Sequence, residues 1–141
     1  MPGSRFCFLT LSALVLLLVG CAGGDGEVKA PLGQEFSLAV AQTAVIRGEN
    51  LKIKFEEVLE DSRCPRGVTC VWEGRVRCLV QLTDNDSSEK IELTEHGLSA
   101  QSSEVTYKDY QFAFHVIPYP EAGKEITTGE YRLLLSVSKL K

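Results

Sequence analysis

The sequence predicts an all-β domain, an antiparallel β-sandwich of six to eight strands, because three observations agree. Apolar and polar residues alternate in short runs from Phe36 onward, as they do in strands that bury one face. Clusters of turn-forming residues separate the runs, and no segment has the 3.6-residue apolar spacing of an amphipathic helix. An immunoglobulin-like Greek key is one candidate topology, and a small β-barrel is the alternative.

Alternation and turn residues set the limits of the individual strands. Val58 falls on the opposite parity from Phe55, which predicts a β-bulge near Glu56 and Glu57. The Asp, Asn and Ser residues at 84–88 form a strong turn signal that ends the preceding run. The expected strands cover residues 36–41, 44–46, 51–58, 75–82, 91–93, 111–116 and 131–138.

The N-terminal segment, residues 1–20, has the composition of an export signal. A single charge, Arg5, precedes a largely apolar run that ends at the small residue Gly20. The run is short for a comfortable membrane-spanning helix, so we interpret it as a secretory signal peptide. A single-pass anchor is an alternative interpretation.

The end of this segment, Leu18-Val19-Gly20-Cys21, resembles the lipobox of bacterial lipoproteins. The resemblance implies that Cys21 is acylated, and several acyl chains hold a protein stably at a membrane. An ordinary signal peptide with a nearby Cys is the alternative. We expect residues 21–35 to form a flexible tether and residues 36–141 to form one sandwich domain. Because residue 22 is Ala rather than Asp, the resemblance points to the outer membrane, facing the periplasm or the exterior, if the organism is Gram-negative.

The charge of the chain limits the classes of partner. The net charge is −4 over 141 residues, and it becomes −5 once residues 1–20 and their single Arg are removed. A mildly acidic domain has no general attraction for nucleic acid or for anionic lipid. The partners that we expect are the membrane, through the N-terminal lipid, and a protein or cell-wall component, with no nucleic acid.

The most distinctive segment is residues 61–74, with the sequence D-S-R-C-P-R-G-V-T-C-V-W-E-G. It is similar to the pattern D-S-R-C-P-x-x-V-x-C-x-W-x-G of a group of small bacterial lipoproteins and exported proteins, and the resemblance covers most of residues 34–141. That group has no assigned activity, so the resemblance implies no catalytic residue. Cys78 departs from the group, because it stands where an apolar strand residue is expected.

Export to an oxidising compartment makes one disulfide possible among the remaining cysteines. Cys7 leaves with the signal and Cys21 is acylated, which leaves Cys64, Cys70 and Cys78. We favour a Cys64–Cys70 bridge, because the Pro and Gly between them favour a tight reversal and Cys78 has the parity of core residues. A bridge that uses Cys78 is the alternative.

Trp72 and the charged residues around it are the candidate binding residues. Trp72 shares parity with Cys70 and Val76, so we expect it to pack inward, with a ligand-binding aromatic as the alternative. The arginines form either an anion-binding patch or charge pairs between adjacent strands, and we favour the pairs. The candidate binding surface comprises Arg63, Arg66, Trp72, Glu73, Arg75 and Arg77.

The sequence gives little support to catalysis, and we expect no metal and no cofactor. The cysteine spacing matches no common zinc arrangement, and His96 and His115 lie far along the chain. No Gly-x-Ser-x-Gly, phosphate loop or His-Glu-x-x-His motif is present. The leading hypothesis is a lipid-anchored envelope protein that presents its cysteine loop to a protein or cell-wall partner. The alternatives are an envelope hydrolase or an inhibitor of one, and a structural component of an envelope assembly.

Overall fold

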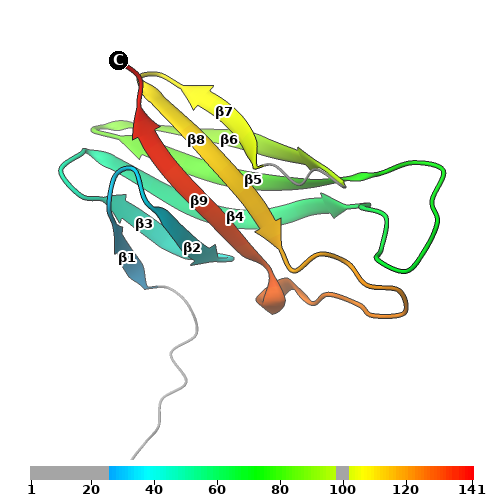
Figure 1. The fold of residues 1–141 in the computed structure, drawn as a ribbon. Coiled ribbons are helices and arrows are strands. Elements are labelled where there is room, and N and C mark those ends of the chain that lie inside the picture. Colours follow the sequence, from blue (N-terminus) through cyan, green and yellow to red (C-terminus); the bar gives the residue numbers. More distant parts are fainter. Residues whose placement is uncertain (1–25, 98–101) are drawn as a thin grey trace, which may run out of the picture.

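The structure is a computed structural model that describes residues 26–97 and 102–141 as a two-layered β-sandwich (Figure 1). The larger sheet has the strand order β1-β3-β4-β5-β6, and the smaller sheet has the order β2-β9-β8-β7. The strands span Glu27–Ala30 (β1), Glu35–Ala39 (β2), Thr43–Ile46 (β3), Leu51–Asp61 (β4), Arg75–Asp84 (β5), Ser87–His96 (β6), Ser103–Tyr107 (β7), Tyr110–Ile117 (β8) and Arg132–Lys139 (β9), with one 3-10 turn at Thr128–Glu130 (η1). The predicted all-β sandwich is therefore confirmed.

All seven strands expected from alternation are present, and the described residues contain two more. The strand β7 was missed because its apolar residues, Val105 and Tyr107, lie only partly buried at a sheet edge. The strand β1 lies inside the segment 21–35 that we expected to be a flexible tether. It pairs in parallel with β3, and Ala30 packs in the core, so the tether prediction is wrong for residues 27–30.

Each sheet contains a run of consecutive strands, and the β1–β2, β2–β3 and β6–β7 connections pass between the two sheets. Strands β3 to β6 are hydrogen-bonded in chain order, as are β7 to β9, and β2 closes the smaller sheet beside β9. The smaller sheet has the strand order of a Greek key numbered from its C-terminal end, because β9, β8 and β7 are consecutive neighbours and β2, joined to them by a long connection, lies beside β9. The bulge predicted near Glu56 and Glu57 is confirmed by a register shift between Phe55 and Glu57, and a second shift follows between Val58 and Glu60.

The core lies between the two sheets and is filled by the inward residues of both. Phe55 and Phe112, the two largest fully buried side chains, come from opposite sheets. Cys78 points into the same core from β5 and is a free thiol, and burial raises its pKa to about 12. Cys64 and Cys70 form the predicted disulfide, with their Cα atoms 5.9 Å apart.

The N-terminal predictions lie outside the described residues. These are the signal peptide at residues 1–20, acylation of Cys21 and the tether residues that precede Gly26. Among the residues that the structure does describe, no helix has the length and apolar character needed to cross a membrane.

Candidate functional site

Residues 62–74, between β4 and β5, form a loop that projects from one end of the sandwich and that we call the cysteine loop (Figure 1). Backbone hydrogen bonds close its base, from the Ser62 amide to the Arg75 carbonyl at 2.8 Å and from the Cys64 amide to the Glu73 carbonyl at 3.0 Å. The disulfide to Cys70 then fixes the path of the chain beyond this base.

The close approach of the two arms requires a glycine at position 74. Gly74 has a φ of +70°, a conformation that side-chain-bearing residues rarely adopt. A Cβ atom at this position would lie 1.8 Å from the backbone oxygen of Ser62. The glycine of the D-S-R-C-P motif segment is therefore needed for the shape of the loop base.

A second loop, residues 118–131, supports the cysteine loop from one side (Figure 1). The Arg66 amide donates to the Pro120 carbonyl at 2.9 Å, and the Ala122 amide donates to the Arg66 carbonyl at 3.1 Å. These bonds join the two loops at the same end of the sandwich, where Tyr119 comes to lie beside the disulfide loop.

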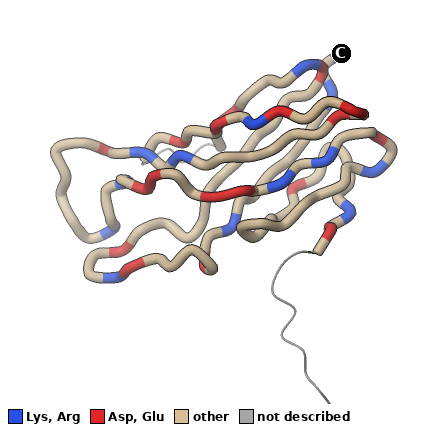
Figure 2. The backbone as a smooth tube through the Cα atoms, turned by 180° about the vertical axis from the view of Figure 1, so that it is seen from behind, with Lys and Arg blue, Asp and Glu red and all other residues tan. Residues whose placement is uncertain are grey.

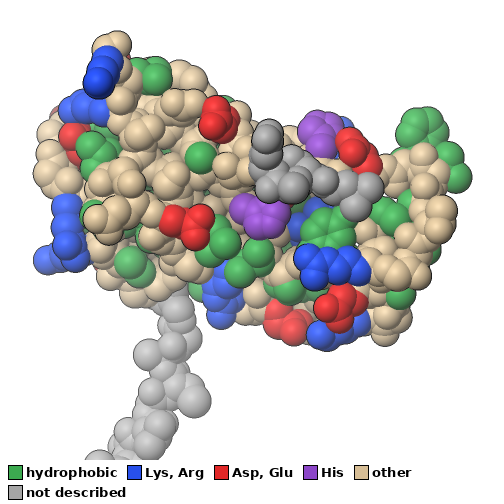
Figure 3. Space-filling model, viewed as in Figure 1, with side chains coloured by type: hydrophobic (Ala, Val, Ile, Leu, Met, Phe, Trp, Pro, Cys, Tyr) green, Lys and Arg blue, Asp and Glu red, His purple; other side chains and the backbone are tan. Residues whose placement is uncertain are grey.

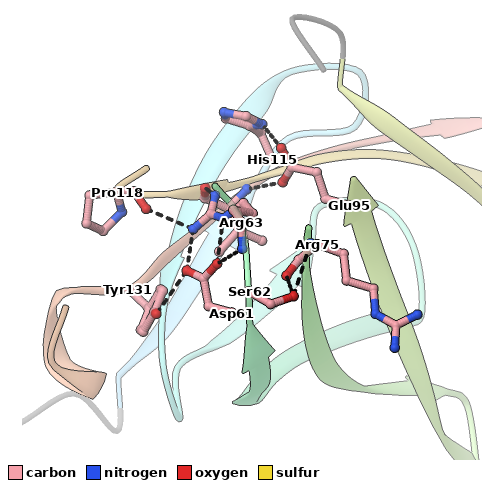
Figure 4. Close-up of polar contacts among 9 residues, drawn as sticks. Asp61, Ser62, Arg63, Arg75, Glu95, His115, Pro118 and Tyr131 are labelled. Carbon is pink, nitrogen blue, oxygen red and sulfur yellow. Dashed lines mark hydrogen bonds and ion pairs between the residues drawn. The ribbon is translucent and has the colours of Figure 1, made fainter. Parts of the chain in front are cut away.

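Arg63, at the base of the cysteine loop, is buried and is the centre of a network of charged hydrogen bonds (Figure 4). Its Nε and Nη2 donate to the carboxylate of Asp61 at 2.8 and 2.6 Å. Its Nη1 donates to the Val116 carbonyl at 2.7 Å, and Nη2 also donates to the Pro118 carbonyl at 3.0 Å. The guanidinium thus ties the start of the loop to the end of β8 in the other sheet.

The same network continues on both sides of Arg63 (Figure 4). The Tyr131 hydroxyl donates to Asp61 at 3.0 Å. The buried carboxylate of Glu95 accepts from the Val116 amide at 2.7 Å and pairs with Nδ1 of His115. We call the set formed by Asp61, Arg63, Glu95, His115 and Tyr131 the buried clasp.

Electrostatics within the buried clasp keep Arg63 charged. Burial disfavours the charged guanidinium, but the hydrogen bonds and the negative charge of Asp61, together with the charge of Glu95, outweigh burial and raise the pKa of Arg63. Burial and the nearby charge of Asp61 raise the pKa of Tyr131 to about 12, so its hydroxyl stays a donor. These residues hold one another in place and leave Arg63 inaccessible to a partner.

The inclusion of Arg63 in the candidate binding surface is therefore wrong. Its side chain is buried, and the hydrogen bonds described above join it to groups inside the fold. Sequence reasoning missed this because the groups that satisfy Arg63 come from Val116 and Pro118, which lie more than fifty residues away. The nearby D-S-R spacing does contain its partner, since Asp61 lies two residues before Arg63.

Arg75 and Arg77 belong to charge pairs on the outer face of the larger sheet, as we favoured from the sequence. Arg77 donates to Glu92 of β6 at 2.7 Å and to Glu60 of β4 at 3.2 Å, and Arg75 lies 3.5 Å from Glu60. Hydrogen bonds from Arg77 lower the pKa values of Glu60 and Glu92. Figure 2 shows charges of both signs interspersed along these strands, so no single-sign anion patch forms here.

Trp72 is exposed rather than buried, which overturns the inward packing expected from its parity. Its exposed fraction is 82%, and that of the neighbouring Val71 is 91%. Strand alternation does not extend to Trp72, because the positive φ of Gly74 interrupts the chain before β5 begins. With Val68, also exposed, these residues place three apolar side chains on the cysteine loop, which we call the apolar tip (Figure 3).

A groove of about 430 Å³ lies beside the apolar tip and is open to solvent. Its apolar lining comes from the disulfide, Pro65, Val68 and Trp72 of the cysteine loop and from Tyr119 of the second loop. Arg66 and Glu73 supply its charged groups. Three residues of the candidate surface, Arg66, Trp72 and Glu73, are therefore brought together at one groove.

The two histidines stand apart from this groove. His115 is held by Glu95 in the buried clasp, and His96 lies 3.9 Å from Glu73, but neither histidine lines the groove. Across residues 26–97 and 102–141, no three His, Cys, Asp or Glu side chains are grouped closely enough to hold a metal ion. Comparisons of the chain with protein-family models, with curated proteins and with solved structures each found no match.

The buried clasp predicts that replacing Arg63 with Leu strongly destabilises the fold. The substitution leaves the carboxylate of Asp61 buried beside unpaired carbonyl groups, and breaking a buried pair in this way costs about 3–5 kcal/mol. Urea unfolding followed by circular dichroism measures the change in the free energy of unfolding.

Arg77→Leu is the matched control for this prediction, because Arg77 also makes two carboxylate contacts but lies at the surface. Exposed ion pairs contribute little to stability, so we expect a much smaller loss. Equal losses for the two variants would show that burial of Arg63 is not what makes its contacts important.

Proposed function

We propose that this chain is an exported, lipid-anchored envelope protein that works as a non-enzymatic binding module, with the apolar tip as its contact surface. The observation that carries the proposal is the exposure of Val68, Val71 and Trp72 on one projecting loop. Adjacent exposed apolar side chains are typical of interaction sites, because contact with a partner removes them from water. The disulfide and the buried clasp support this role, since a loop held in one conformation loses less entropy on binding.

A protein is the favoured partner class over a cell-wall glycan. The side chains of Val68 and Val71 offer no hydrogen bonds to sugar hydroxyls, whereas they suit the apolar centre of a protein interface. Trp is among the residues that contribute most to such interfaces. The apolar tip therefore fits a protein surface better than a polysaccharide.

The proposed lipid anchor would keep the start of the domain close to a membrane. Five residues separate Cys21 from Glu27, the first residue of β1, and a chain of this length spans at most about 20 Å. The start of β1 would therefore lie within about 20 Å of the membrane that holds the anchor.

Acylation of Cys21 predicts that the protein fractionates with membranes and that Cys21→Ser releases it from them. The substitution removes the only thiol at the lipobox-like site, so no acyl chain attaches there. Membrane and soluble fractions, compared after metabolic labelling with palmitate, measure both effects. Cys78→Ser is the control, and labelled Cys21→Ser protein in the membrane fraction would contradict the anchor.

Cross-linking tests the contact surface. A photoreactive amino acid at position 71 should cross-link one defined envelope protein in intact cells, and adding Trp72→Ala should remove the cross-link because it truncates the largest side chain of the apolar tip. The control is the same photoreactive residue at Asn85, in the β5–β6 turn, at the other end of β5 from the cysteine loop. A cross-link that survives Trp72→Ala, or one formed to glycan, would contradict a protein-binding tip.

A further inference from the structure

We propose that the groove beside the apolar tip binds a peptide segment of the partner in which an apolar side chain lies next to a carboxylate. The inference rests on the proposed function and adds the chemistry of what is recognised. A volume of about 430 Å³ lies in the range of about 300–1,000 Å³ that is common for ligand pockets. The open shape suits a segment that enters and leaves the groove.

The apolar half of the recognition comes from the lining. The disulfide, Pro65 and Val68 face the same groove as the aromatic side chains of Trp72 and Tyr119. An apolar side chain that enters is removed from water and contacts aromatic surfaces, which supply much of the contact area in protein interfaces. A short polar segment would gain little from such a lining.

Arg66 supplies the recognition of the ligand's carboxylate. Its guanidinium lies 5.2 Å from the centroid of the Tyr119 ring, within the range of a cation–π contact that orients it. Arg63 lies 5.0 Å from the same centroid, but Asp61 already neutralises it. Arg66 forms no ion pair with any residue in the described part of the chain, so a ligand carboxylate would provide the bidentate partner that its guanidinium lacks.

Glu73, the other charged residue of the groove, also affects where a ligand carboxylate binds. Glu73 lies 3.9 Å from Nδ1 of His96, whereas Arg66 has no such neighbour among the described side chains. A ligand carboxylate would therefore be attracted to Arg66 and repelled by Glu73.

A protein segment fits these features better than a lipid surface or a free small molecule. Val71 is almost fully exposed and lies outside the groove lining, so the surface to be covered is larger than the groove. A broad surface of anionic headgroups would meet Glu73 and Glu121 as well as Arg66, whereas a single carboxylate can contact Arg66 alone. A macromolecular partner covers both the groove and the tip.

A peptide-display selection on the purified full-length protein tests the inference. We expect the selected peptides to carry Asp or Glu next to an apolar residue. Arg66→Glu should weaken binding of the best synthetic peptide by about 10- to 100-fold, the range for a lost hydrogen bond to a charged group. The 141-residue sequence has a single Trp, and it lies in the groove, so Trp72 fluorescence measures the affinity directly.

Arg47→Glu is the matched control, because Arg47 is also an exposed arginine and lies in the β3–β4 turn at the opposite end of β4. It should leave the peptide affinity unchanged, and circular dichroism checks that both variants fold. No enrichment of acidic peptides, or equal binding by Arg66→Glu, would overturn the inference. Vesicles of phosphatidylethanolamine and phosphatidylglycerol test the lipid alternative. If they shift the Trp72 fluorescence of the unaltered protein and of Arg66→Glu equally, the inference is also overturned. If Trp72→Ala still removes the cross-link in cells while the peptides show no acidic preference, the proposed function stands and this inference fails.

Discussion

The buried pair between Arg63 and Asp61 is the interaction on which the candidate site depends. Removing a charged guanidinium from water is costly unless its donors are used, and here it donates four hydrogen bonds, one from Nε, one from Nη1 and two from Nη2. A Lys at this position would lack the planar fork that reaches a carboxylate and two carbonyls together. Because the Val116 and Pro118 carbonyls belong to the other sheet and its following loop, Arg63 fixes the cysteine loop relative to the whole sandwich.

Both backbone polar groups of Val116 form a hydrogen bond with a charged side chain, which extends this constraint across the sandwich. Its carbonyl accepts from Arg63, and its amide donates to Glu95, which belongs to the edge strand of the opposite sheet. Arg63, which follows β4, and Glu95, near the end of β6, therefore both contact the strand β8 of the smaller sheet. This arrangement leaves residues 66–73, including the apolar tip, exposed to solvent, while Arg63 and Cys64 at the base of the loop are buried.

Much of the fold was predictable from the sequence, because the sandwich repeats one local pattern. Alternation located the strands that bury a full apolar face, and it placed Cys78 in the core. The Pro- and Gly-containing loop between Cys64 and Cys70 favoured the disulfide that the structure contains. The strand β1 was not predicted, because it has only four residues next to a glycine-rich stretch and this is too short to show a clear apolar and polar alternation.

The site was less predictable, because its key features depend on contacts between distant segments. Alternation assigned Trp72 to the core, but Gly74 interrupts the strand and turns the preceding residues away from the sheet. The D-S-R spacing showed that Asp61 lies near Arg63, yet burial of the pair depends on carbonyls that no local pattern reveals. The groove itself needs Tyr119, which hydrogen bonds between two loops bring beside the disulfide.

The central claim is that the cysteine loop is held in one conformation by the buried clasp and the disulfide. Backbone order parameters of residues 64–73 from nuclear magnetic resonance relaxation test it most directly. The account predicts values of about 0.85 through the loop, equal to those of the strands that flank it. Values below about 0.6 in the loop, with ordered strands beside it, would contradict the claim that the fold presents a preformed binding surface.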